Sequence, residues 1–257
     1  MRRLLATAVC GAALGAAPAA WAQQTIESLG LAVTTTPLLA TDYLFRGISQ
    51  TRNRPAGQLS LDVQHETGLY VGGFVSNATF LGSPYNDTRQ ELDLLAGYRR
   101  SFGALSLDGG LIAYLYPGQT KPEGTQLNEY FELGLKAAYT LEPVKFLAAF
   151  NWSPNFFGRS GNAYYLEGGA DLSLPLGFTA FGRLGYQWIQ NNPRFGTPDY
   201  LWYGMGVQRE IVLGVTGALG YYGTNISQNE CAPVPGRADG GQKICDNRVM
   251  FSISRTF

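Results

Sequence analysis

Hydrophobic and polar residues alternate along most of the chain, in segments of about ten residues separated by Gly, Pro, Asn and Asp. Alternation with a period of two is typical of β-strands that have one apolar face. The first segment is the least regular, because Pro37 interrupts it, and a bend or bulge is expected there. The pattern predicts twelve strands, at 31–48, 57–66, 69–77, 90–102, 105–116, 128–141, 144–153, 163–173, 177–189, 200–208, 211–224 and 247–257.

The connections between these strands alternate between short and long. Short turns are expected at Thr67-Gly68, Gly103-Ala104, Glu142-Pro143, Leu174–Leu176 and Arg209-Glu210. Longer polar connections are expected at 49–56, 78–89, 117–127, 154–162, 190–199 and 225–246. An even number of antiparallel strands, joined alternately by short turns and longer loops, is typical of an outer-membrane barrel.

The apolar face of each strand can point into a soluble core or outward into lipid, and the aromatic residues favour lipid. Trp152, Trp188 and Trp202 adjoin predicted long connections, as in an aromatic belt at a membrane interface. The last strand ends on Phe257 and resembles the assembly signal of outer-membrane proteins, although Arg255 interrupts its apolar face. The sequence therefore predicts an all-β fold, a transmembrane antiparallel barrel of about twelve strands. A soluble β-sandwich or barrel is the alternative.

The first residues form a separate unit. Arg2 and Arg3 precede a short apolar run, and Ala20-Trp21-Ala22 follows it with small residues at both outer positions. A basic start, an apolar stretch and a site of this kind predict a secretory signal peptide at 1–22. The remainder, 23–257, is then one barrel domain exported to a bacterial outer membrane.

Charge and composition agree with this class of protein. The chain has 19 basic and 19 acidic residues, and loss of the two arginines of the signal peptide would leave 17 basic residues. Without a basic surplus, no nucleic-acid partner is expected. Only 15% of the residues are charged while 13% are aromatic, which is a poor composition for a soluble surface.

Two cysteines remain once Cys10 is removed with the signal peptide. An even pair in an exported protein predicts a disulfide between Cys231 and Cys245. A zinc site is the weaker interpretation, because two thiolates without a nearby His supply half of a ligand set. The sequence predicts no metal and no cofactor.

The polar faces of the strands supply candidate residues for a pore. Eight acidic and four basic side chains among them predict a mildly cation-selective channel for small polar solutes or ions. The alternative is that these charges pair with one another and plug the lumen. The predicted pore-lining residues are Asp42, Arg46, Asp62, Glu91, Asp93, Arg99, Asp108, Glu132, Lys136, Glu167, Asp171 and Arg183.

Turn geometry predicts two pairs among these residues. A two-residue hairpin loop at Gly103-Ala104 places Arg99 opposite Asp108 on the neighbouring strand. A three-residue loop at Leu174–Leu176 places Glu167 opposite Arg183. Opposite charges at facing positions stabilise a sheet, so both pairs are expected to form ion pairs in the lumen.

Several motifs occur in a fixed order along the chain. They are DYLFRGISQT (42–51), GLYVGGFVSN (68–77), ELDLLAGY (91–98), YLYPG (114–118), NEYFE (128–132), YYLE (164–167), YYGTN (221–225) and CDNRVMFSISRTF (245–257). Together they resemble the TorF porin family, described elsewhere only as a conserved family of unknown function. The resemblance covers nearly the whole chain after residue 22 and implies an outer-membrane pore.

Other functions remain open at this stage. An outer-membrane hydrolase would use a Ser and a His near the outer leaflet, but His65, the one histidine, lies beside a predicted short turn. Calcium could bind the loop acids Asp87, Asp199, Asp239 and Asp246, which lack the spacing of a known calcium loop. A non-conducting barrel could act in binding or surface structure through its loops. The expected partners are outer-membrane lipid or lipopolysaccharide, solutes or ions, and the barrel-assembly machinery, through the strand ending at Phe257.

Overall fold

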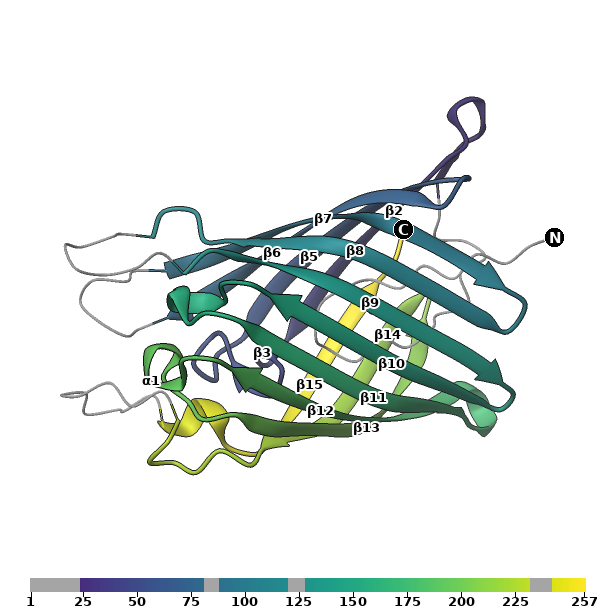
Figure 1. The fold of residues 1–257 in the computed structure, drawn as a ribbon. Helices are drawn as coiled ribbons and strands as arrows, with labels where there is room; N and C mark the ends of the chain where they lie inside the picture. The colour runs from purple at the N-terminus through teal and green to yellow at the C-terminus, as the bar shows by residue number, and fades with distance from the viewer. Residues whose placement is uncertain (1–23, 81–87, 120–127, 232–241) are drawn as a thin grey trace.

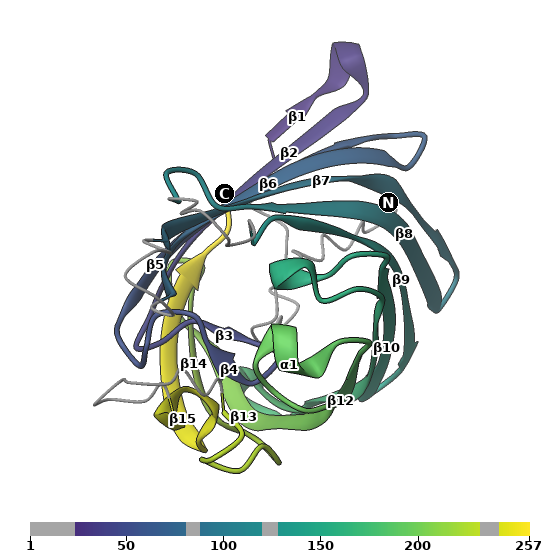
Figure 2. The same ribbon diagram turned by 60° about the vertical axis from the view of Figure 1, so that its left-hand side comes forward.

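The computed structural model describes residues 24–80, 88–119, 128–231 and 242–257, which form a closed antiparallel β-barrel of twelve strands (Figures 1 and 2). Its strands are β2 and β5 to β15, and β2 closes the ring by pairing with β5 on one side and β15 on the other. The predicted fold class is therefore confirmed. The predicted signal peptide, 1–22, lies outside the described residues.

Most strand positions follow the alternation in the sequence. The barrel strands are β2 (Leu31–Ala40), β5 (Ala56–His65), β6 (Leu69–Phe80), β7 (Thr88–Phe102), β8 (Leu105–Leu115), β9 (Tyr130–Leu141), β10 (Val144–Ser153), β11 (Ala163–Ser173), β12 (Phe178–Ile189), β13 (Tyr200–Val212), β14 (Val215–Thr224) and β15 (Arg248–Arg255). A short strand, β1 (Gln24–Ile26), pairs with the start of β2 through η1 (Glu27–Leu29) and projects beyond the ring (Figure 1). Short connections lie at one end of the barrel and long ones at the other, which we call the mouth.

The outer surface is apolar and the lumen is polar. Leu94, Leu135 and Leu166 each leave more than half of their surface exposed on the outside. Asp93 and Gln187, in contrast, are completely buried on the inward faces of β7 and β12. A soluble β-protein has the opposite arrangement, so the exterior of this barrel suits lipid.

The aromatic residues follow this division only in part. Trp188 faces outward and is 41% exposed, whereas Trp202 faces the lumen and is 5% exposed. The prediction of a membrane belt is therefore wrong for Trp202, whose indole Nε1 donates to the Tyr165 hydroxyl at 2.7 Å. A tryptophan beside a long connection can therefore project from either face of its strand.

Two predicted turns lie at other residues than expected. β13 and β14 continue past Arg209-Glu210 to a turn at Leu213-Gly214, where both residues have positive φ, as a tight hairpin turn requires. The β11–β12 turn lies one residue later than predicted, at η3 (Pro175–Gly177), and the Leu174 amide donates to the Phe178 carbonyl at 2.8 Å. As a result Arg183 faces Gly169 and not Glu167, a shift of two residues that keeps Arg183 in the lumen. The pair Arg99 and Asp108 has the predicted register.

The predicted first strand is wrong beyond Ala40. There the chain leaves the wall and enters the lumen, where β3 (Leu44–Phe45) and β4 (Ile48–Ser49) form a small hairpin inside the ring (Figure 2). Its two-residue turn places Arg46 and Gly47 at positive φ. We call residues 41–55 the lumen segment. Its side chains gain burial on both faces, which a single wall strand would not give them.

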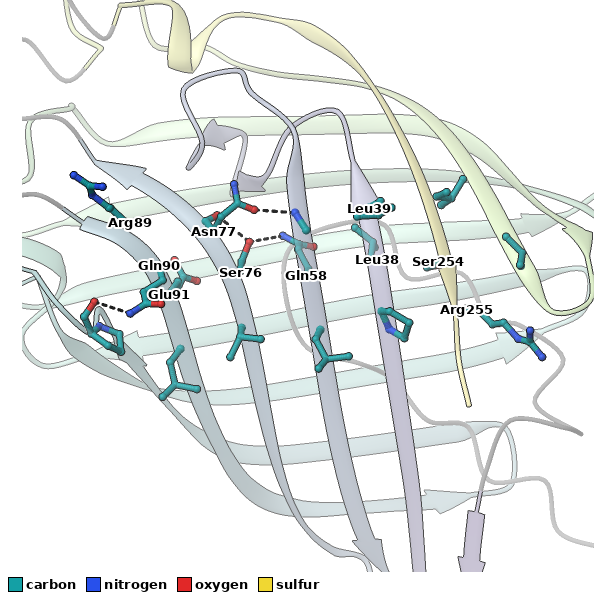
Figure 3. Close-up of a pocket in the computed structure, with 18 residues that line it drawn as sticks. Leu38, Leu39, Gln58, Ser76, Asn77, Arg89, Gln90, Glu91, Ser254 and Arg255 are labelled. Carbon is teal, nitrogen blue, oxygen red and sulfur yellow. Dashed lines mark hydrogen bonds between the residues drawn. The ribbon is translucent and has the colours of Figure 1, made fainter.

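The seam between β2 and β15 is the shortest pairing in the ring. Regular pairing runs from Ser252–Ala40 to Ser254–Leu38, and Thr35 and Phe257 exchange two further backbone hydrogen bonds. Of the bend or bulge expected at Pro37, the bulge is absent against β5, because the missing N–H removes a donor on the β15 side. A groove of about 850 Å³ crosses the outer wall here (Figure 3).

Candidate functional site in the barrel lumen

The tip of the lumen segment is fixed to the wall through Arg46. Its Nη1 and Nη2 donate to Oε1 and Oε2 of Glu132 at 2.9 and 2.6 Å, and Nη1 also donates to Oε1 of Gln187 at 2.5 Å. The guanidinium carbon lies 3.8 Å from the ring centre of Tyr165 and 4.6 Å from that of Phe45. We call these five residues the Arg46 cluster. Two-point pairing with a carboxylate fixes both the position and the orientation of Arg46.

The wall holds Glu132 in place from two other strands. Asn151 Nδ2 on β10 donates to Glu132 Oε2 at 3.0 Å, and the Tyr114 hydroxyl on β8 donates to the same oxygen at 3.3 Å. Glu132 is 1% exposed and Arg46 is 5% exposed. A buried charge is costly unless it is paired and hydrogen-bonded. Because both conditions hold, the cluster keeps the lumen segment inside the barrel.

The base of the lumen segment is organised around Asp42. Its Oδ1 accepts hydrogen bonds from the hydroxyls of Ser49 at 2.6 Å and Thr51 at 2.7 Å. Its Oδ2 accepts from Arg248 Nη1 on β15 at 2.7 Å. Asp42 thus joins the two ends of the segment to each other and to the wall.

Three further ion pairs connect strands of the wall. Arg99 Nε lies 2.9 Å from Oδ2 of Asp108, and Arg99 Nη1 lies 3.4 Å from Oδ1 of Asp62. Arg183 Nη2 lies 2.6 Å from Oδ1 of Asp171. The alternative that lumen charges pair with one another thus describes much of what is observed.

The predicted pore-lining residues fall into two groups. Asp42 and Arg46 belong to the lumen segment, so their predicted placement on a wall strand is wrong. The other ten have inward positions on barrel strands, and they are Asp62, Glu91, Asp93, Arg99, Asp108, Glu132, Lys136, Glu167, Asp171 and Arg183. Whether a permeating solute contacts any of the twelve stays a prediction.

Sequence reasoning identified Glu132 but missed other residues that hold the lumen segment. Arg248 and Asn151 were not among the candidates, although both lie on inward positions of predicted strands. One signal was present for the segment itself. The dipeptide Arg46-Gly47 stands between the apolar pair Leu44-Phe45 and Ile48, and a Gly in that place favours a tight hairpin.

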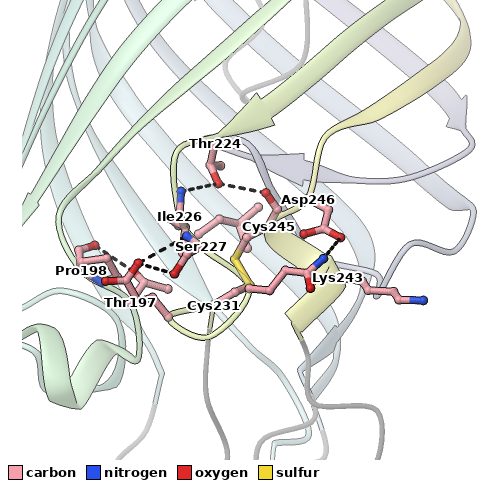
Figure 4. Close-up of a disulfide and its surroundings, with 12 residues drawn as sticks. Thr197, Pro198, Thr224, Ile226, Ser227, Cys231, Lys243, Cys245 and Asp246 are labelled. Carbon is pink, nitrogen blue, oxygen red and sulfur yellow. Dashed lines mark hydrogen bonds between the residues drawn. A yellow bond between two sulfur atoms is a disulfide. The ribbon is translucent and has the colours of Figure 1, made fainter.

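A disulfide joins Cys231 and Cys245 in the loop between β14 and β15, as predicted (Figure 4). The loop is also tied to the wall, because the Thr224 hydroxyl donates to the Cys245 carbonyl at 2.9 Å. Arg248 Nη2 donates to the Lys243 carbonyl at 2.7 Å. The disulfide therefore supports the loop that orients Arg248 toward the lumen segment.

Removal of this disulfide is expected to lower stability. Replacing Cys231 and Cys245 together by Ser should reduce the free energy of unfolding by about 3 kcal/mol, the value for a closed loop of this length. Urea titration of the barrel in lipid vesicles measures the change. The wild-type protein under reducing conditions is the control, since it loses the cross-link without any substitution. An unchanged midpoint in both samples would contradict the expectation.

Other candidate sites have simpler surroundings. His65 Nδ1 lies 2.8 Å from the Thr67 hydroxyl, at the short-turn end. Asp199 accepts a hydrogen bond from the Ile189 amide, whereas Asp87 and Asp239 lie outside the described residues. Within the described part of the chain, no group of three or more His, Cys, Asp or Glu could hold a metal ion. No helix among the described residues is long and apolar enough to cross a membrane.

Solved structures of porins share this fold. The KdgM porin has a TM-score of 0.55 at 11% identity, with 87% of this chain and 99% of that chain covered. The NanC porin has a TM-score of 0.55 at 9% identity, with 88% and 98% covered. A second KdgM structure, described as in complex with disordered oligogalacturonate, also has a TM-score of 0.55, at 9% identity, with 88% and 98% covered.

The sequence itself places the chain in a family. No curated protein matches it. Residues 26–257 match the model of a family described as "Bacterial protein of unknown function (Gcw_chp)". The match spans all but the first residues, and the chain therefore belongs to the Gcw_chp family.

Proposed function

We propose that the protein is an outer-membrane channel for passive diffusion of small polar solutes or ions, narrowed by the lumen segment. The observation that carries this proposal is the closed barrel with an apolar exterior and charged residues on its inward faces. Such a barrel satisfies every wall hydrogen bond within lipid and leaves its polar side chains for the lumen. The porin fold supports the same function. Stepwise current through the refolded protein in a planar bilayer tests it.

A mild preference for cations is the finer part of this proposal. The structure adds Arg248 and Lys145 to the basic residues at inward positions, so eight acidic residues stand against six basic ones. Five of the acidic residues already pair with Arg46, Arg99, Arg183 or Arg248. The remaining excess of acidic over basic residues is small, and it supports only weak selectivity for cations.

Selectivity is expected to depend on Glu167. In a KCl gradient, the reversal potential should give a potassium-to-chloride permeability ratio modestly above one, and Glu167→Gln should lower that ratio because it removes an inward negative charge. Glu66→Gln is the matched control, since Glu66 is exposed beside the short turn between β5 and β6. A reversal potential that favours chloride in the wild type would refute cation selectivity.

A second function is favoured by the lumen segment itself. Its side chains Tyr43 and Leu44 are each 2% exposed, and the Tyr43 hydroxyl donates to Glu91 at 2.6 Å on the wall. A barrel filled in this way could be non-conducting and act through its mouth loops. Silence in the bilayer at high protein loading would favour that function over the channel.

Location, assembly and the absence of catalysis belong to the same proposal. The outward side chains of Val249 and Phe251 on β15 would face lipid or lipopolysaccharide, and the strand ending at Phe257 would engage the assembly machinery. We propose no catalytic role for His65, because the mouth, where an outer-leaflet substrate would enter, is at the other end of the barrel.

A further inference from the structure

A cavity of about 340 Å³ lies at the mouth, between the lumen segment and two loops of the wall. One loop contains η2 (Phe157–Arg159) and the other contains α1 (Asn192–Phe195). Figure 2 shows both short helices turned toward the middle of the ring, as are β3 and β4. The volume falls at the small end of the range for small-molecule sites. We call this space the mouth cavity.

Eight of the residues that line it are aromatic. Tyr130 and Phe156 are 4.7 Å apart between ring centres, Phe156 and Phe195 are 5.3 Å apart, and Phe80 and Phe157 are 5.4 Å apart. All five rings line the mouth cavity. Rings at these distances meet edge to face or tilted, and they present both faces and edges to a further ring. The cavity therefore suits a planar aromatic group.

Charged groups in the lining favour an anion. Arg52 comes from the lumen segment and Arg194 from α1, so the two basic residues belong to different elements. Glu91 is the one acidic residue of the described lining, and it already accepts the Tyr43 hydroxyl. Arg194 donates one hydrogen bond to the Arg159 carbonyl, at 3.2 Å. A guanidinium has five N–H donors, so Arg194 can also bind a carboxylate.

We propose that the mouth cavity binds a small aromatic carboxylate, with its ring among the five aromatic rings and its carboxylate toward Arg194 and Arg52. A sugar fits the lining less well, because its many hydroxyls each need a hydrogen-bonding partner, whereas eight of the lining residues present aromatic rings. Phe45, Ile48 and Gln50 of the lumen segment also line the cavity, so the ligand contacts that segment directly. Binding goes beyond the proposed channel function and does not require that the barrel conduct.

The test is calorimetric titration of the full barrel, refolded in detergent, with benzoate. Saturable binding is expected. Three comparison ligands each lack one feature of benzoate: benzyl alcohol lacks the charge, cyclohexanecarboxylate lacks the aromatic ring, and galacturonate carries the charge on a sugar. Each should bind at least about tenfold more weakly than benzoate, because one charge-assisted interaction or ring contact is missing. No saturable benzoate binding, or tighter binding of galacturonate, would overturn the proposal.

Two variants assign the site. Arg194→Gln and Arg52→Gln should each weaken benzoate binding about tenfold, because each removes a charged donor. Arg159→Gln is the matched control, since it removes the same charge at the same mouth from an exposed side chain that does not line the cavity. Heat-modifiable migration on a gel verifies that every variant is folded. Equal benzoate binding by the wild type and both arginine variants would refute this site. If the wild-type protein binds benzoate but carries no current in a planar bilayer, only the channel function is refuted.

Discussion

Replacing the tip of the lumen segment, Leu44–Ser49, by two glycines is expected to raise the single-channel conductance several-fold. The Gln50 amide donates to the Tyr43 carbonyl at 2.7 Å, so two residues are enough to reconnect the chain as a tight turn. The replacement removes the β3–β4 hairpin and with it Arg46. Combining it with Glu132→Gln avoids a buried carboxylate without a partner.

The measurement is current through the refolded variant in a planar bilayer. Glu132→Gln alone is the control, because its amide can still accept a hydrogen bond from Arg46 and the lumen segment stays in place. This control should show a much smaller change in conductance than the combined variant. If the combined variant migrates as a folded barrel and its conductance equals that of the wild type, the lumen segment does not limit permeation.

The barrel was predictable because each wall strand has one face in lipid and the other in the lumen. This environment forces a period of two, and the pair Arg99–Asp108 followed from the alternation and one two-residue turn. The Glu167–Arg183 pair failed because the turn, in which Leu176 and Gly177 adopt positive φ, lies one residue later than predicted, and this moves the register by two residues. Strand periodicity carries no information on such a turn.

The lumen segment could not be predicted for a different reason. Leu44, Phe45 and Ile48 continue the apolar content of β2, so the local sequence looks like more of the same strand. Tertiary contacts turn the chain inward. Arg46 finds Glu132, which lies 86 positions away in sequence, and Asp42 finds Arg248, which lies 206 positions away. No local pattern records partners at such separations.

The Arg46–Glu132 and Arg183–Asp171 pairs allow stability and conduction to be separated. The closest N–O distance is 2.6 Å in both pairs, and all four side chains are less than a tenth exposed. Arg46→Ala and Arg183→Ala should each lower the free energy of unfolding by about 3–5 kcal/mol, because each leaves a buried carboxylate without its cation. Urea titration in lipid vesicles measures this loss.

Only Arg46→Ala is expected to raise the conductance, because Arg183 connects β12 to β11 and does not hold the lumen segment. A double-mutant cycle with Glu132→Ala should show a coupling energy of about 0.5–3 kcal/mol in stability, since the two residues are in contact. The conductance of the double variant should equal that of Arg46→Ala, because the connection is already lost in the single variant. If Arg183→Ala raises the conductance as much as Arg46→Ala does, the effect reflects general loosening of the wall rather than release of the lumen segment.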